Sequence, residues 1–136
     1  LPMEAEWEYS CRAGTKTAYY SGDVEKDLDR VAWYAANSRH AAHPVGQKGR
    51  NAFGLYDMHG NVWEWCQDWH EERYYSKSPA EDPQGAAHGA YRVLRGGSWY
   101  FNPRYCRSAF RSWSNPDYRD YFIGFRAAAA PASRTP

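Results

Sequence analysis

The sequence lacks an excess of charge of either sign, because its 136 residues include 17 basic and 16 acidic side chains. Electrostatic binding to nucleic acid or to an anionic membrane relies on a clear basic surplus. Long apolar runs are also missing, whereas a membrane-spanning helix needs about 20 predominantly apolar residues. We therefore expect no nucleic-acid partner and no membrane span. The sequence has no leader pattern at Leu1 and predicts no compartment.

Cysteine is scarce, with Cys11, Cys66 and Cys106 as its three positions. An odd number gives no complete disulfide framework, and spacings of 55 and 40 residues match no zinc or CxxC pattern. We expect buried, unpaired thiols. The five histidines show no HxH or HExxH spacing, so they indicate no metalloprotease-type zinc site.

Aromatic side chains are abundant instead, at 18% of the chain with seven Trp and twelve Tyr. A small core cannot hide all of them. Tyr and Trp on a surface offer rigid contact area with a polar edge. We expect some of these rings to fill a loop-rich core and others to lie in solvent.

The chain length suits one domain, which we place at residues 1–126, followed by a small-residue tail at 127–136. A helix is expected over Pro2–Ala13, with acidic residues in its first turn, and a short helix within Asp23–Tyr34. Strands are expected at Val62–Trp65, Tyr91–Leu94 and Phe122–Ala128. Tyr74–Gly89, rich in Ser, Pro, Gly and charge, predicts a surface loop, and the stretch between the second and third strands is expected to be long and irregular.

Three segments carry the most specific patterns: LPMEAEWEYSCRAG at 1–14, NAFGLYDMHGNVWEWCQDW at 51–69, and the Gly-, Trp- and Arg-rich stretch from Tyr91 to Phe125. In this order they resemble the formylglycine-generating-enzyme, or sulfatase-modifying-factor, family. The resemblance implies a loop-rich α+β domain of the C-type-lectin-like fold, with few short strands and one or two helices. The N-terminal half that usually precedes these motifs is absent, which indicates either a fragment or a shortened form.

A cation site is suggested by Asp57 and Glu64, which lie seven residues apart with a Gly–Asn turn between them. Carboxylate and carbonyl oxygens are the ligands that Ca²⁺ prefers. The family resemblance implies a structural calcium held by the side chains of Asp57 and Glu64 and the backbone oxygens of Gly60 and Val62. The alternative is that Glu64 pairs with an arginine and Asp57 caps a turn.

The family's oxidases bind copper(I) through two cysteines in a GGSY-x-C-x₄-C pattern, and soft thiolates suit that ion. Here the first of these positions is Phe101 and the second is Cys106. Copper is therefore not expected. Cys106 stays as the candidate catalytic residue of the alternative, enzymatic interpretation, and no catalytic residue is assigned in the main one.

The stretch Trp99–Phe122 combines Tyr, Phe, Asn, Ser and Asp, which are residue types found in antibody-like binding surfaces. It resembles the variable region of diversity-generating-retroelement proteins, where adenines of AAC codons are randomised. The ligand-binding candidates are Tyr100, Phe101, Asn102, Tyr105, Phe110, Ser112, Ser114, Tyr118, Asp120, Tyr121 and Phe122. The arginines among and after them are expected to be internal struts, namely Arg107, Arg111, Arg119 and Arg126. The alternative is that half of the aromatics are core.

These observations favour a binding domain that contacts a protein or other macromolecular ligand through Trp99–Phe122, with calcium stiffening the loops. Two alternatives stay open. One is a formylglycine-generating-type oxidase, and the other is an accessory domain of a larger protein.

Overall fold

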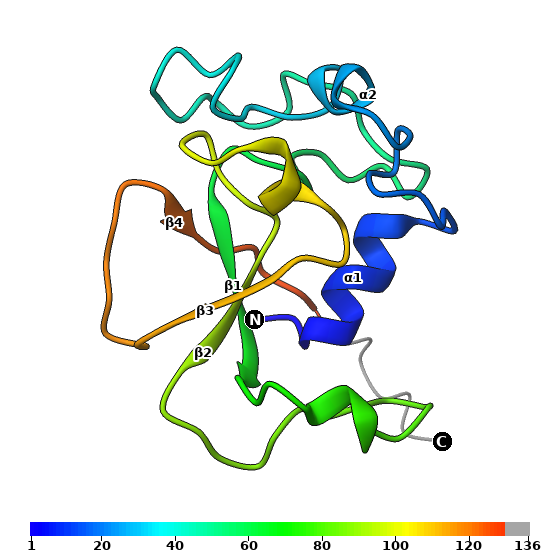
Figure 1. Cartoon of the computed structure of the whole chain (residues 1–136), viewed down its shortest axis with the longest axis vertical. Coiled ribbons are helices and arrows are strands. Elements are labelled where there is room, and N and C mark those ends of the chain that lie inside the picture. The colour runs from blue at the N-terminus through cyan, green and yellow to red at the C-terminus, as the bar shows by residue number, and fades with distance from the viewer. Residues whose placement is uncertain (130–136) are drawn as a thin grey trace.

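The computed structural model describes residues 1–129 as a curled four-stranded sheet with short helices and long loops (Figure 1). The elements in chain order are α1 (Glu4–Arg12), α2 (Glu25–Asp29), β1 (Trp63–Trp69), η1 (Tyr74–Ser76), β2 (Arg92–Arg95), η2 (Pro103–Cys106), β3 (Arg111–Ser114) and β4 (Ile123–Gly124). The predicted loop-rich α+β, C-type-lectin-like fold is confirmed. None of the helices in this part of the chain is long and apolar enough to cross a membrane. The predicted boundary at residue 126 stays a prediction, and most of the predicted tail lies outside the described residues.

The sheet has the order β3-β2-β1-β4. β2 pairs antiparallel with both β1 and β3, and β4 pairs parallel with β1. Successive side chains of a strand point to opposite faces. Cys66 and Val93 therefore lie on one face, where they pack with Trp7 and Cys11 of α1. We call this the helix face, and the opposite side the outer face.

Helix α1 forms where the sequence predicts it. Glu4 and Glu6 occupy its first turn and Arg12 its last, which complements the helix dipole. Met3 supplies no side-chain cap, but its N–H donates to Glu6 Oε2 at 2.8 Å. The helix ends with Ala13 in the left-handed region at φ 45°, and Gly14 follows it with φ 91°.

A second apolar cluster lies around α2 and the loops near it. Its buried members are Tyr19, Leu28, Val31, Ala32, Tyr34 and Cys106. Leu28 of α2 and Cys106 belong to this same cluster, so the segment 98–108 packs against α2. Side chains from the first third of the chain therefore support the loops of the second half.

Two strand predictions need correction. The expected strand Phe122–Ala128 contains only Ile123–Gly124, because β4 bonds to β1 only over that short register. The expectation of an irregular stretch between the second and third predicted strands missed β3, Arg111–Ser114. Its four residues, Arg-Ser-Trp-Ser, contain a single aromatic ring and lie on a half-exposed edge of the sheet, so no apolar periodicity marks the strand.

Candidate functional site

The outer face of the sheet begins with Trp63 and Trp65 of β1. Trp65 lies opposite Leu94, and Leu94 lies opposite Ser112 of β3. Residues that face each other across a sheet point to the same side. The predicted ligand residues Ser112 and Ser114 thus belong to the outer face, away from α1.

An aromatic layer covers part of this face, and we define it as Trp63, Tyr100, Phe101, Tyr105, Phe110 and Phe122. Phe101 is its centre, with ring centroids 5.4 Å from Trp63, 5.7 Å from Tyr100, 5.4 Å from Tyr105 and 5.5 Å from Phe122. These contacts are edge-to-face, the geometry in which the positive edge of one ring meets the negative face of another. Tyr105 and Phe110 extend the layer at 5.0 Å. Side chains held in this way lose little freedom on binding.

None of the predicted ligand residues is buried. Tyr100, Tyr118 and Tyr121 are 61%, 44% and 92% exposed. The carboxylate of Asp120 accepts hydrogen bonds from the Tyr118 hydroxyl at 2.7 Å and the Tyr121 N–H at 2.6 Å. The structure therefore divides the predicted set into the aromatic layer and a more exposed group in the connection from β3 to β4.

Backbone hydrogen bonds fix the layer from below. The Phe101 carbonyl accepts from Ala35 N at 3.0 Å, and the Phe122 carbonyl accepts from Trp63 N at 2.8 Å. The Ser38 hydroxyl donates to the Trp99 carbonyl at 2.8 Å. The loop that presents these aromatics is thus bonded to segments distant in sequence.

The arginines do not share one role. Arg111 and Arg126 are internal struts as expected, paired with Glu4 and Glu64. Arg107 and Arg119 are exposed and donate only to nearby backbone carbonyls, so the strut prediction was wrong for both. Because each acceptor lies only one to three residues away along the chain, the guanidinium groups stay in solvent.

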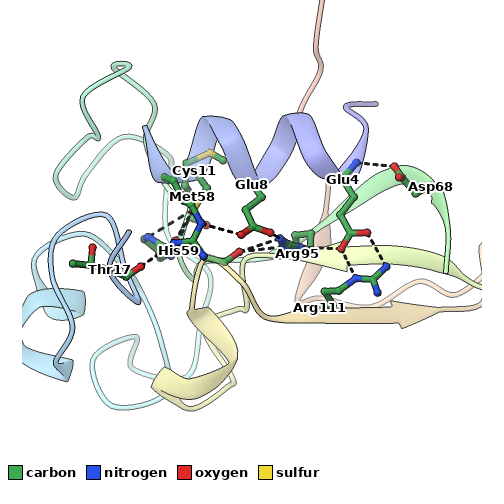
Figure 2. Close-up of polar contacts among 11 residues, drawn as sticks. Glu4, Glu8, Cys11, Thr17, Met58, His59, Asp68, Arg95 and Arg111 are labelled. Carbon is green, nitrogen blue, oxygen red and sulfur yellow. Dashed lines mark hydrogen bonds and ion pairs between the residues drawn. The ribbon is translucent and has the colours of Figure 1, made fainter. Parts of the chain in front are cut away.

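Sequence reasoning missed a further strut, Arg95, which is 0% exposed. Figure 2 shows its guanidinium beneath α1, between Glu4 and Glu8. It donates to Glu4 Oε1 at 3.3 Å, to Glu8, and to the Ser108 carbonyl at 3.0 and 3.1 Å. The sequence signal was its position directly before Gly96 and Gly97, both of which take positive φ in the structure.

His59 is the second such residue, since the sequence indicated for it only a possible ligand beside the calcium-like motif or an ordinary surface or core group, and the structure buries it completely. Its Nε2 accepts from Tyr20 N at 3.0 Å, so Nδ1 carries the proton that is donated to the Cys106 carbonyl at 2.6 Å. Figure 2 shows it near Cys11 and Met58. Burial lowers the pKa of His59 to about 4, because the charged ring would lose its hydration. The ring is a neutral structural link between the two halves of the core.

The residues at the copper motif do not fit copper(I). The Phe101 ring occupies the first thiol position and belongs to the aromatic layer. Cys106 is fully buried, and burial raises its pKa to about 12. A side-chain carbon on Gly97 would come within 2.6 Å of its sulfur, so the thiol fills a glycine-lined space. One packed thiol cannot supply the two soft ligands that this ion takes in the family pattern.

The two acidic residues proposed for calcium are both buried, but they have different partners. The Glu64 carboxylate accepts from Arg126 Nε at 2.7 Å, Arg126 Nη2 at 2.8 Å and Trp7 Nε1 at 2.7 Å. Asp57 Oδ2 accepts from Gly46 N at 2.8 Å, while Oδ1 has no hydrogen-bond partner among the residues described.

The glycine between these acids has a packing role. A side-chain carbon on Gly60 would come 2.2 Å from the Trp33 carbonyl, and its φ is +71°. Across residues 1–129, no group of three or more Asp, Glu, His or Cys side chains could hold a metal. Both oxygens of Glu64 already accept from a guanidinium, whereas the buried Oδ1 of Asp57 has no partner among the described residues, so the two acids differ in what they offer a divalent ion. Calcium at Asp57, Gly60, Val62 and Glu64 stays a prediction to be tested.

The fold and the outer face define a C-type-lectin-like domain with an aromatic surface and no paired thiols at the copper motif. The model of the sulfatase-modifying factor enzyme 1-like domain matches residues 1–131, and the chain belongs to this family.

The relatives include both enzymes and proteins of other kinds. The formylglycine-generating enzyme of Streptomyces coelicolor is 39% identical over 94% of this chain and 46% of that protein. Among solved structures, Treponema denticola variable protein 1 shares 42% identity with a TM-score of 0.87, over 92% of this chain and 45% of the other. PvdO from Pseudomonas aeruginosa shares 32% identity with a TM-score of 0.80, over 92% and 50%. The chain therefore spans about half the length of these relatives.

Proposed function

We propose that this domain binds a macromolecular ligand, most directly a protein, through the aromatic layer and the exposed side chains of the β3–β4 connection. The proposal rests on one observation: every ligand residue expected from the sequence is accessible, and the central one, Phe101, stands where the oxidases carry a copper ligand. Rigid aromatic anchors surrounded by small polar groups are typical of protein-binding surfaces.

The similarity to a variable protein supports the proposal, since that structure matches over most of this chain. We further propose that the positions between the scaffold arginines are diversified genetically. A near-copy of the codons for Trp99–Phe125 beside a reverse-transcriptase gene would support diversification. Its absence would leave an ordinary, non-varying binding domain.

A displayed library tests the binding face directly. The exposed members of the predicted ligand set would be randomised on the displayed chain, namely Tyr100, Asn102, Tyr118 and Tyr121. The library is then sorted first for folding and afterwards for binding to a panel of purified proteins. We expect most library members to keep the fold, and some to bind one panel protein specifically. The expectation follows because none of these side chains is buried.

The matched control is a library at exposed apolar positions elsewhere, such as Tyr9, Val45, Phe53 and Tyr91. It should fold equally often and give no specific binders. If the face library folds far less often than the control library, the aromatics are core and the proposed function fails.

Two alternatives have specific support. The identity to formylglycine-generating enzymes favours an oxidase, although the single thiol at the copper motif argues against it. The serine/threonine-protein kinase pkn1 of Chlamydia pneumoniae matches 94% of this chain over only 20% of its own length, at 41% identity. That match favours an accessory domain within a larger protein.

A further inference from the structure

The environment of Glu64 differs from that of a metal ligand. Its side chain is almost completely buried on the helix face of β1. Both carboxylate oxygens accept from Arg126, and Oε2 also accepts from the Trp7 indole. Parallel N–H donors of this kind form the bidentate arrangement in which a guanidinium matches a carboxylate.

The same guanidinium reaches the start of the loop that would hold the ion. Arg126 Nη2 donates to the Tyr56 carbonyl at 2.9 Å, directly before Asp57. Arg126 follows β4 by two residues, and Gly124 of β4 lies opposite Glu64 of β1. One side chain therefore connects the loop, the central strand and the end of β4.

The charge of Glu64 is already neutralised. Arg126 carries one positive charge and donates to both oxygens of this buried carboxylate. A divalent ion at Glu64 would bring two more positive charges next to a guanidinium within a buried region, where like charges repel strongly.

We infer that the Arg126 guanidinium takes the place of a divalent cation in the loop between Asp57 and Glu64. The loop and β4 are then held together by a cation that belongs to the chain itself. Arg126 does not replace a partner of Asp57, whose Oδ2 accepts from the Gly46 N–H and whose buried Oδ1 has no partner among the described residues.

A consequence follows for the binding face, and it rests on the proposed function. β4 directly follows Phe122, whose carbonyl accepts from Trp63 N. Fixing β4 through Arg126 also fixes this edge of the aromatic layer, so ligand binding needs no calcium.

Thermal unfolding tests the inference on the parent chain. Its midpoint should agree within about 1 °C in chelator and in millimolar calcium, because a ligand that does not bind cannot shift the equilibrium. A saturable rise in midpoint with calcium that disappears in Glu64→Gln would overturn the inference. A rise of the same size in both proteins reports binding elsewhere and agrees with it.

A pair of arginine variants supplies the second test. Arg126→Gln should lower the midpoint by more than about 5 °C, since it leaves a buried carboxylate without its cation. The matched control Arg119→Gln removes an exposed guanidinium that contacts only backbone carbonyls, and it should change the midpoint by less than about 2 °C. Equal losses in the two variants would contradict the inference. If Arg126→Gln does not fold, that loss agrees with the inference and the calcium titration of the parent still decides it.

Binders from the library would bind equally in calcium and in chelator. A library without binders counts against the proposed function, while the melting results decide the role of Arg126 separately.

Discussion

The guanidinium of Arg111, in β3, donates to both carboxylate oxygens of Glu4, in the first turn of α1, at 2.7 and 2.9 Å. Glu4 also forms an ion pair with Arg95, and its side chain is only 2% exposed. This ion pair connects the edge strand β3, which borders the outer face, to α1 on the helix face of the sheet. Surface residues around β3 can change without loosening that strand.

Replacing Arg111 by Ala should lower the free energy of unfolding by roughly 2–4 kcal/mol, because it leaves a buried carboxylate partly unpaired. Arg119→Ala should stay within about 0.5 kcal/mol, since Arg119 is exposed. Denaturant unfolding of both variants measures the difference. Similar losses would show that the Glu4 pair adds nothing beyond a surface contact.

Serine substitutions separate the exposed tyrosines from the aromatic layer. Tyr121→Ser should change the free energy of unfolding by no more than about 0.5 kcal/mol, because this ring is 92% exposed. Phe101→Ser should cost about 1–3 kcal/mol through lost ring contacts. The loss in the free energy of unfolding for Tyr105→Ser should lie between these two values, because Tyr105 is half-buried. If Tyr121→Ser is as damaging as Phe101→Ser, the division of the face into two groups is wrong.

Stability should fall as the pH is lowered from about 6.5 to about 4, and His59 is the reason. The unfolded chain binds a proton on this ring near pH 6.5, whereas the pKa of His59 in the folded chain is lowered to about 4 by burial. Protonation thus favours unfolding throughout this window. The free energy of unfolding falls by roughly 3 kcal/mol between pH 6.5 and pH 4. Above pH 6.5 the contribution of His59 is constant.

Urea unfolding of the parent and of His59→Gln over this pH range measures the effect. The variant should be less stable at neutral pH and should show a flatter dependence. His70, whose pKa is also lowered by burial, contributes in the same direction in both proteins, and Asp68, whose pKa is raised by burial, contributes in the opposite direction. Parallel curves would exclude His59 as the titrating group.

The three thiols should be unreactive in the folded chain. Cys11, Cys66 and Cys106 are free and buried, and burial raises the pKa of each, which suppresses the reactive thiolate. A thiol-specific reagent at neutral pH should label all three only after denaturant is added. Rapid labelling of Cys106 in the native protein would revive its catalytic candidacy.

Formylglycine formation should not occur on incubation with copper(I), oxygen and a CxPxR peptide. The reason is the phenylalanine ring at the first copper position. The peptide mass reports any conversion of its cysteine to the aldehyde. Conversion at a catalytic rate would establish the oxidase alternative. Phe101→Cys need not restore activity, because the remaining thiol is packed behind Gly97.

The sequence by itself determined the features that depend on local spacing. Helix α1 follows from the acids in its first turn and from Trp7 and Cys11 at the spacing of one helical face. The motifs around Asp57 and Gly97 identified the family, and Phe101 separated this chain from the oxidase pattern. Each of these signals is contained within a short window of sequence.

Only the tertiary structure decided which polar residues are partners. Arg111 and Arg119 look alike in sequence, yet one reaches Glu4 across a separation of 107 residues and the other stays in solvent. The sequence left Glu64 with an arginine partner or a metal as alternatives, and the fold brings Arg126, 62 residues away, to both of its oxygens. The physical reason is that buried charges are satisfied by whatever opposite charge the folded chain brings close, and local periodicity carries no information about that distance.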